Sequence, residues 1–266
     1  MTDHVVLAGV LFAFGLIVGS FLNVCIYRLP LGRSVVWPGS RCTICDRNLA
    51  WFENIPVVSW LVLGGRCRTC RTPISWMYPV VELATGALFV ATYEAYGPTP
   101  LFVVRVVFGC ALIVLFAIDL VHQILPNVIT LPGVIVGLVA SVFLRPGWQS
   151  SIIGLLVGGV FPFLIAEAYL RVRGREGMGM GDFKMFAMVG AFLGWPLVWI
   201  TLILSSLLGV VIGGSALLIS RRGLATRLPF GTFIAVAALV CVLFEAPVVG
   251  AYDAAVSAYL TWAGLA

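Results

Sequence analysis

The chain has 266 residues, of which 61% are hydrophobic and 10% are charged, with a net charge of +5 and a mean hydropathy of +1.10. Soluble domains carry about 25% charged residues, so this composition excludes a soluble protein and indicates a multispanning membrane protein. The continuous Leu, Val, Ile and Ala runs do not alternate as transmembrane β-strands do, so we expect helices.

A helix needs about 20 apolar residues to cross the hydrocarbon core of a bilayer. Apolar runs predict about eight membrane-spanning helices, of which the sixth is short. The expected spans are Val5–Ile26, Tyr78–Tyr96, Leu101–Ile118, Val128–Leu144, Ser150–Leu170, Phe183–Gly194, Leu197–Ile219 and Pro229–Val249. The first run lacks the basic start and the nearby small-residue cleavage site of a signal peptide, so we expect it to be retained.

The sixteen Lys and Arg residues are distributed unevenly between the loops. Seven lie between the first and second expected spans, four at the junction of the fifth and sixth, and three between the seventh and eighth. Only Arg105 and Arg145 lie near the other face. Basic loops stay in the cytoplasm, so both termini are expected on the opposite side. Anionic lipid accounts for the positive charge, and no nucleic-acid partner is expected.

The one sizeable soluble segment is the loop between the first two expected spans. It holds Cys42-x-x-Cys45 and Cys67-x-x-Cys70, with 21 residues between the pairs. Two such pairs match a zinc ribbon, in which four thiolates surround one structural metal ion. Two disulfides are the alternative, but disulfides rarely persist in the reducing cytoplasm. A redox C-x-x-C pair would need a βαβ context, which this loop lacks.

Two polar residues lie inside or beside the first two expected spans. Asn23 lies within the hydrocarbon zone, where we expect it to hydrogen-bond another helix. Glu82 lies near the cytoplasmic end of the second span. It is either a surface acid or a functional group facing the loop, and the sequence leaves both interpretations open.

Asp119 follows the third expected span. Pro126 stops the helix, so Asp119 lies in its last turn or two, at the negative end of the helix dipole, where a carboxylate is disfavoured. One interpretation is an interfacial acid in water, paired with Lys184 or an arginine. The other is a functional group, because ionisable residues at membrane depth are usually functional. His122 has no further histidines near it in the sequence and is interpreted as an interfacial residue.

Asp182 opens the sixth expected span, after the glycines Gly179 and Gly181. Asp is a good helix N-cap, and glycines let the chain turn sharply. The same glycines would let a substrate backbone approach the carboxylate closely. A lone G-x-G-D pattern is weak, but a second acid at the same membrane depth strengthens it.

These two acids could support hydrolysis by an aspartyl dyad. If their helices touch, the two carboxyl groups share a proton; one activates a water while the other polarises the scissile carbonyl. A serine hydrolase is disfavoured because no G-x-S-x-G is present. A proton-coupled transporter is the main alternative, although no internal repeat is evident and both acids lie at one membrane surface. An assembly factor that docks partners through the cysteine loop is a third.

In combination, these motifs resemble the bacterial type IV prepilin peptidases, also called leader peptidase/N-methyltransferases, which are G-x-G-D membrane aspartic proteases. The shared segments are Gly19–Val24 with Arg28–Pro30, both cysteine pairs, Asn54–Leu61, Arg66–Cys70, Tyr78–Glu82, Asp119 with Leu125–Asn127, and Gly179–Lys184. The resemblance covers nearly the whole chain. The tail after Gly250 contains no recognisable motif.

The resemblance implies that Asp119 and Asp182 are catalytic and remove the basic leader of type IV prepilins or type II secretion pseudopilins, after glycine, at the cytoplasmic face. It also implies S-adenosylmethionine-dependent methylation of the new N-terminal amine, attributed to the cysteine-bearing loop. Gly65 falls in the methylation-associated stretch, although it stands in Gly64-Gly65-Arg66 where many members have Arg-Gly-Arg or Arg-Gly-Lys. Glu82 is a second candidate for the methyl-transfer site.

The expected architecture is an all-α polytopic protein of the bacterial inner membrane, in contact with lipid. We expect a first transmembrane helix (1–28), a cytoplasmic zinc-binding loop (29–77), a transmembrane protease core (78–250) and a C-terminal tail (251–266). Zn²⁺ and S-adenosylmethionine are the expected cofactors.

Overall fold

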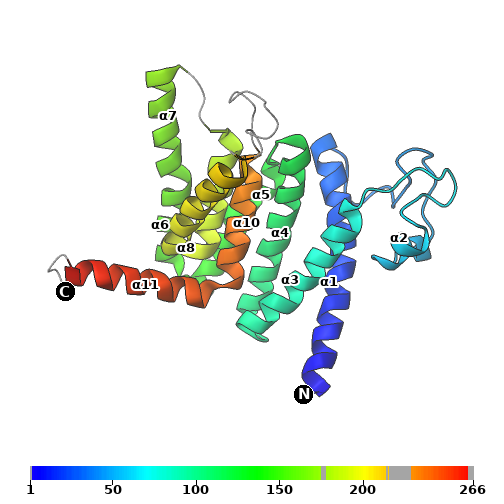
Figure 1. Cartoon of the computed structure of the whole chain (residues 1–266), viewed down its shortest axis with the longest axis horizontal. Coiled ribbons are helices and arrows are strands. Elements are labelled where there is room, and N and C mark those ends of the chain that lie inside the picture. The colour runs from blue at the N-terminus through cyan, green and yellow to red at the C-terminus, as the bar shows by residue number, and fades with distance from the viewer. Residues whose placement is uncertain (1, 175–177, 214, 216–228, 263–266) are drawn as a thin grey trace. The chain divides into compact units, whose positions relative to one another are not determined.

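The computed structural model of this protein describes residues 2–174, 178–213, 215 and 229–262 (Figure 1). Within these ranges the chain is helical apart from its loops, and its only β-structure is two isolated bridges. The expectation of an all-α membrane fold is therefore confirmed. The chain divides into two compact units, Met1–Ile118 and Asp119–Ala266, here called the N-terminal and C-terminal units.

The N-terminal unit is built on two long helices that lie side by side, α1 and α3 (Figure 1). Its elements are α1 (Thr2–Arg28), η1 (Leu29–Leu31), η2 (Trp51–Asn54), α2 (Val58–Val62), α3 (Met77–Tyr96) and α4 (Pro100–His122), which continues into the C-terminal unit. Glycines let α1 and α3 approach closely, because a Cβ atom at Gly19 would lie only 2.7 Å from the Cα atom of Glu82. The expected interhelical bond of Asn23 is present, since its amide nitrogen donates to the carbonyl of Tyr78 at 3.0 Å.

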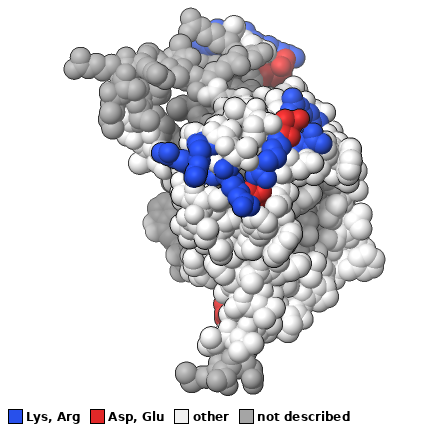
Figure 2. Space-filling model, turned by 90° about the vertical axis from the view of Figure 1, so that its right-hand side faces the viewer, with Lys and Arg blue, Asp and Glu red and all other residues white. Residues whose placement is uncertain are grey.

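The outer face of α1 consists of large apolar side chains. Val10, Phe14, Ile17 and Phe21 are each more than half exposed. Figure 2 shows a band of Lys and Arg side chains across this face, and the wide area below the band carries almost no charge. An apolar surface of this extent is explained by contact with lipid, not water.

The C-terminal unit packs its helices through glycines. Its elements are α5 (Asn127–Phe143), α6 (Trp148–Leu155), the π-helical η3 (Leu156–Val160), α7 (Phe161–Arg173), α8 (Met180–Leu208), the π-helical η4 (Gly209–Gly213), α10 (Phe230–Leu243) and α11 (Glu245–Trp262). Gly154 lies against Gly190, and Gly158 lies against the backbone of Phe186. Gly154 and Gly158 are four residues apart, the spacing at which small residues let membrane helices touch.

The helix α8 is folded back on itself at Gly194. This glycine has a φ of 79°, a conformation that a side-chain-bearing residue rarely adopts. Phe186, before the break, and Gly209, after it, both lie against Phe230. A straight helix would separate positions 186 and 209 by about 35 Å, so the two legs must run in opposite directions. The legs correspond to the sixth and seventh expected spans, although residues 214 and 216–219 of the seventh lie outside the described part of the chain.

Four helical runs among the described residues are long and apolar enough to cross a membrane, and a fifth results if one bent pair counts as a single span. By length and composition they are His4–Leu31, Pro100–His122, Trp148–Arg173, Met180–Ile212 and the bent pair Phe230–Leu243 with Glu245–Trp262. Met180–Ile212 includes the reversal at Gly194, so it is not one straight crossing. The chain is thus a multi-pass membrane protein, but the expected number of eight spans is not confirmed.

The last expected span, Pro229–Val249, differs most from the structure. The helix breaks at Phe244, and α11 leaves α10 at an angle of 92°. Residues 251–262, expected as a tail, belong to this second helix. The sequence does not predict this break, because the apolar run continues across it and hydropathy alone does not report a change of helix direction.

Candidate active site and cysteine cluster

Asp119 lies in the last turn of α4, which ends at His122, before Pro126. This placement agrees with the stop that Pro126 predicts. The side chain of Asp119 is only 5% exposed, and its Oδ2 atom accepts the backbone N–H of Thr232 at 2.8 Å. Thr232 lies in the first turn of α10. The carboxylate at the end of one helix therefore binds an N–H group that the start of another helix leaves free.

Asp182 lies in the first turn of α8 and is 9% exposed. Its Oδ2 atom accepts the backbone N–H of Gly179 at 3.2 Å. The helix N-cap is Gly179 and Asp182 is the third helical residue, so Asp182 caps the helix by reaching back and is not itself the N-cap. Gly181 lies against Leu125, where a Cβ atom would meet that side chain at 3.0 Å.

The C-terminal unit brings the two carboxylates together, close enough to interact electrostatically. The side chain of Leu125 lies beside both Gly181, next to Asp182, and Gly231, next to Asp119. One side chain therefore contacts the surroundings of both carboxylates. A Cβ atom at Gly231 would lie 2.9 Å from Oδ2 of Asp119. The candidate active site is thus formed by the end of α4 and the starts of α8 and α10.

Gly231 and Thr232 are the site residues that the sequence analysis missed. They stand 112 and 113 residues after Asp119, at the start of a helix where hydropathy predicts only an apolar span. The available signal was local: Pro229 and Gly231 lie on either side of Phe230, where that helix begins.

Lys184 does not pair with Asp119 in the structure. Its ammonium nitrogen donates to the side-chain oxygen of Asn127 at 2.9 Å. Glu167, further away on α7, forms an ion pair with Arg171 at 2.9 Å. Among the described residues, no Lys or Arg forms an ion pair with Asp119 or Asp182. Two buried acids without a cation can hold one proton between them and activate a water.

The two cysteine pairs of the N-terminal unit fold in the same way. Cys42 donates its backbone N–H to the carbonyl of Arg47, and Cys67 donates to Thr72 in the matching register. Isolated antiparallel bridges close each turn, Arg41 with Asn48 and Arg66 with Pro73. A repeated turn of this kind points the two sulfur atoms of each pair toward a common centre.

The four sulfur atoms fit a tetrahedral metal ion. The Sγ atoms of Cys42, Cys45, Cys67 and Cys70 all lie within 4.8 Å of one another, and those of Cys42 and Cys70 are 3.7 Å apart. Zinc–sulfur bonds of about 2.3 Å in a tetrahedron place sulfur atoms about 3.8 Å apart. Hydrogen bonding to the side chain and backbone of Thr72 lowers the pKa of the Cys70 thiol to about 6, which favours the thiolate that a metal needs.

Glu82 faces the cysteine loop and is not a surface acid. It is 7% exposed, and its Oε2 atom accepts the backbone N–H of Val57 at 2.7 Å. The side chain of Ser20 lies close to this carboxylate. The structure thus settles the position that the sequence left open.

Gly65 lies against the indole ring of Trp60. Its φ is 64°, and a Cβ atom there would meet the indole of Trp60 at 2.9 Å. The indole N–H of Trp60 donates to the carbonyl of Ile74 at 3.2 Å. The absence of a side chain at Gly65 therefore has two effects. It permits the left-handed backbone conformation, and it leaves space for the indole ring of Trp60.

Two family models match the chain. Residues 13–96 match the bacterial peptidase A24 N-terminal domain, and residues 106–214 match the type IV leader peptidase family. No solved structure matches the chain significantly.

Curated relatives carry the name prepilin leader peptidase/N-methyltransferase. The protein from Myxococcus xanthus is 43% identical over 80% of this chain, and the match spans 64% of that relative's length. The proteins from Pseudomonas putida and Pseudomonas aeruginosa are 35% and 36% identical, over 86% and 94% of this chain and 88% and 92% of their own lengths. None of these comparisons supports the transporter alternative.

Proposed function

Because this chain belongs to the type IV leader peptidase family, we propose that it is a membrane aspartic endopeptidase that cleaves the leader from type IV prepilins or secretion pseudopilins. The observation that carries the proposal is the pair of buried carboxylates of Asp119 and Asp182, brought together at helix ends in one unit. The names of the relatives support the substrate class.

In the proposed reaction, the two carboxyl groups share one proton. The ionised group takes a proton from water as the water attacks the carbonyl carbon of the last leader residue, glycine in the family. The protonated group polarises that carbonyl and then the roles exchange, so that the leaving amine gains a proton. The N–H groups of Thr232 and Gly179 hold the two carboxylates in place during the exchange. Gly179 and Gly181 leave space for the substrate backbone.

The second proposed reaction methylates the new N-terminal amine. S-adenosylmethionine supplies the methyl group: the amine lone pair forms the N–C bond, the C–S bond breaks, S-adenosylhomocysteine leaves, and the amine proton passes to water. We assign this reaction to the N-terminal unit, with Gly65 and Glu82 as candidate residues. The N-methyltransferase part of the relatives' name supports it.

We further propose that the four cysteines hold a structural Zn²⁺, because the sulfur positions match its coordination. The proposed organisation is a first helix (1–28), a zinc loop (29–77), a protease core (78–250) and a C-terminal segment (251–266). The distribution of basic residues supports a cytoplasmic active site and termini on the opposite side.

The peptidase proposal is tested by incubating purified full-length protein with a prepilin and following the loss of the leader by gel mobility. Asp119→Asn and Asp182→Asn each remove a general acid–base group, so each should slow cleavage by at least about 1,000-fold. Both variants should keep the wild-type fold, because Asn retains an oxygen that accepts the same backbone N–H. Normal cleavage by either well-folded variant would defeat the dyad mechanism.

A further inference from the structure

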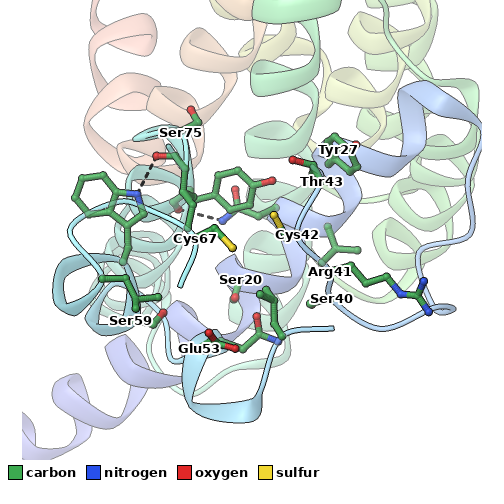
Figure 3. A pocket seen from close by; sticks show the side chains of 18 of the residues that line it. Ser20, Tyr27, Ser40, Arg41, Cys42, Thr43, Glu53, Ser59, Cys67 and Ser75 are labelled. Atoms are coloured by element: carbon green, nitrogen blue, oxygen red, sulfur yellow. Dashed lines mark hydrogen bonds between the residues drawn. The ribbon is translucent and has the colours of Figure 1, made fainter. Parts of the chain in front are cut away.

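A cavity of about 400 Å³ lies in the N-terminal unit, between α1, the start of α3 and the cysteine loop. This volume is in the range of small-molecule binding sites. Figure 3 shows Ser20 and Tyr27 of α1, Glu53 of η2 and Ser59 of α2 arranged around it. The sulfur atoms of Cys42 and Cys67 reach the same wall.

Five charged side chains line this cavity, and besides Glu82 they are of two kinds: Glu53 and Arg41 form ion pairs, whereas Arg28 and Arg68 contact neutral groups. Glu53 is buried but forms an ion pair with Arg47 at 2.7 Å. At the rim, Arg41 pairs with Asp46, and the guanidinium of Arg68 lies over the ring of Phe52 at 5.4 Å. Arg28 donates to two loop carbonyl groups, those of Ser34 and Gly39, at 3.0 Å each.

Glu82 is the one acid of the lining that has no ion pair with a Lys or Arg in the described part of the chain. Its hydrogen-bond donor is neutral, the backbone N–H of Val57. A buried carboxylate is costly unless an opposite charge approaches it. Trp60, Tyr27 and Tyr78 line the same cavity, and aromatic faces also attract cations. Glu82 and the aromatic rings therefore offer a place for a cationic group and a flat ring within this cavity.

The backbone that meets Glu82 is strained. Val57 has a φ of 61° and a ψ of −51°, which is rare for a β-branched residue. It is the central residue of a three-residue turn, closed by the N–H of Val58 on the carbonyl of Pro56 at 2.6 Å. Strain of this kind persists where surrounding contacts impose it, and it clusters at ligand sites. Here it aims an N–H group at the carboxylate inside the cavity.

We propose that this cavity binds S-adenosylmethionine and that the Glu82 carboxylate faces the sulfonium of that ligand. The ligand's chemistry matches the lining: a sulfonium for the carboxylate, an adenine for the aromatic rings, and hydroxyl groups for Ser20 and Asn54. The inference rests on the proposed methyl transfer and places it in the N-terminal unit, whereas the paired aspartates belong to the C-terminal unit.

The test compares two ligands that differ in charge. S-adenosylmethionine carries the sulfonium, and S-adenosylhomocysteine has a neutral thioether in its place. Their affinities for the purified full chain are measured by isothermal titration calorimetry, in wild type, Glu82→Gln and Glu94→Gln. Gln retains an oxygen for the N–H of Val57, so Glu82→Gln removes the charge and leaves the bond. Glu94 is an exposed acid on the same helix, near His4, and serves as the matched control.

Glu82→Gln should weaken S-adenosylmethionine binding by about tenfold and leave S-adenosylhomocysteine binding within about twofold. Glu94→Gln should change neither. Equal losses for both ligands, or no loss for either, would overturn the assignment of the carboxylate to the sulfonium. Zinc content measured in the same samples checks that the loop remains folded.

A second measurement does not depend on any variant. Ultraviolet cross-linking of labelled S-adenosylmethionine to the wild-type chain, followed by peptide mapping, should label residues 20–82. Label confined to residues 119–262 would contradict the proposal. Prepilin cleavage and methylation are assayed on the same preparation. If the protein cleaves and methylates but is labelled outside residues 20–82, the assignment of the cavity is wrong and the proposed function stands. If it neither cleaves nor methylates, the proposed function is wrong.

Discussion

The cysteine loop and the carboxylate pair are held in place in different ways. The loop has short helices and two β-bridges, and its order depends on hydrogen bonds, one buried ion pair and four convergent thiols. The carboxylate pair lies at the ends of long helices that pack through glycines, with several side chains fully buried. The loop should therefore be sensitive to the loss of the proposed Zn²⁺, and the carboxylate pair to the addition of a single carbon atom.

The largest expected effect comes from removing the metal. A loop of this size cannot bury enough apolar surface to fold alone, and structural zinc contributes about 10–16 kcal/mol in small zinc domains. Chelation, or Cys42→Ser, should abolish S-adenosylmethionine binding and methylation and reduce cleavage far less. Metal analysis and both activity assays on one sample check this. Unchanged methylation with unchanged metal content in Cys42→Ser would show that the cysteines are not ligands.

The next effect is the addition of one methyl group at Gly231. In Gly231→Ala the new Cβ atom would lie 2.9 Å from Oδ2 of Asp119, so the carboxylate must move. A displacement of about 1 Å at a catalytic group can cost about 100-fold in rate, and we expect cleavage to fall by that factor. Methylation of a pilin that already lacks its leader should not change. Gly250→Ala adds the same atom to α11 in open space and should cleave normally.

A smaller effect is expected at Gly65. Gly65→Ala should weaken S-adenosylmethionine binding by about tenfold, because the new atom would displace the Trp60 ring that lines the cavity. Gly64 has a similar φ of 61° but no neighbour within 4 Å, so Gly64→Ala introduces the backbone strain without the clash. Similar losses of S-adenosylmethionine affinity in both variants would show that backbone strain causes the effect. The role assigned to Trp60 would then be wrong.

In each of the two regions, the features that depend on residues close together in the sequence were predictable. The cysteine spacing predicted the four-sulfur cluster, and Pro126 placed Asp119 in the last turn of its helix. The partners were hidden because they are distant in sequence. Thr232 meets Asp119 from 113 residues away, and Val57 meets Glu82 only through a strained turn that its sequence does not favour.

The central claim is that two reactions take place in two separate regions of one chain. The most direct measurement is the intact mass of a pilin that already lacks its leader, after incubation with Asp182→Asn protein and S-adenosylmethionine, beside an uncut prepilin in the same tube. The account predicts one added methyl on the leaderless pilin and no change in the prepilin. A folded, zinc-loaded Asp182→Asn protein that leaves both masses unchanged, while wild type methylates the leaderless pilin, would contradict it.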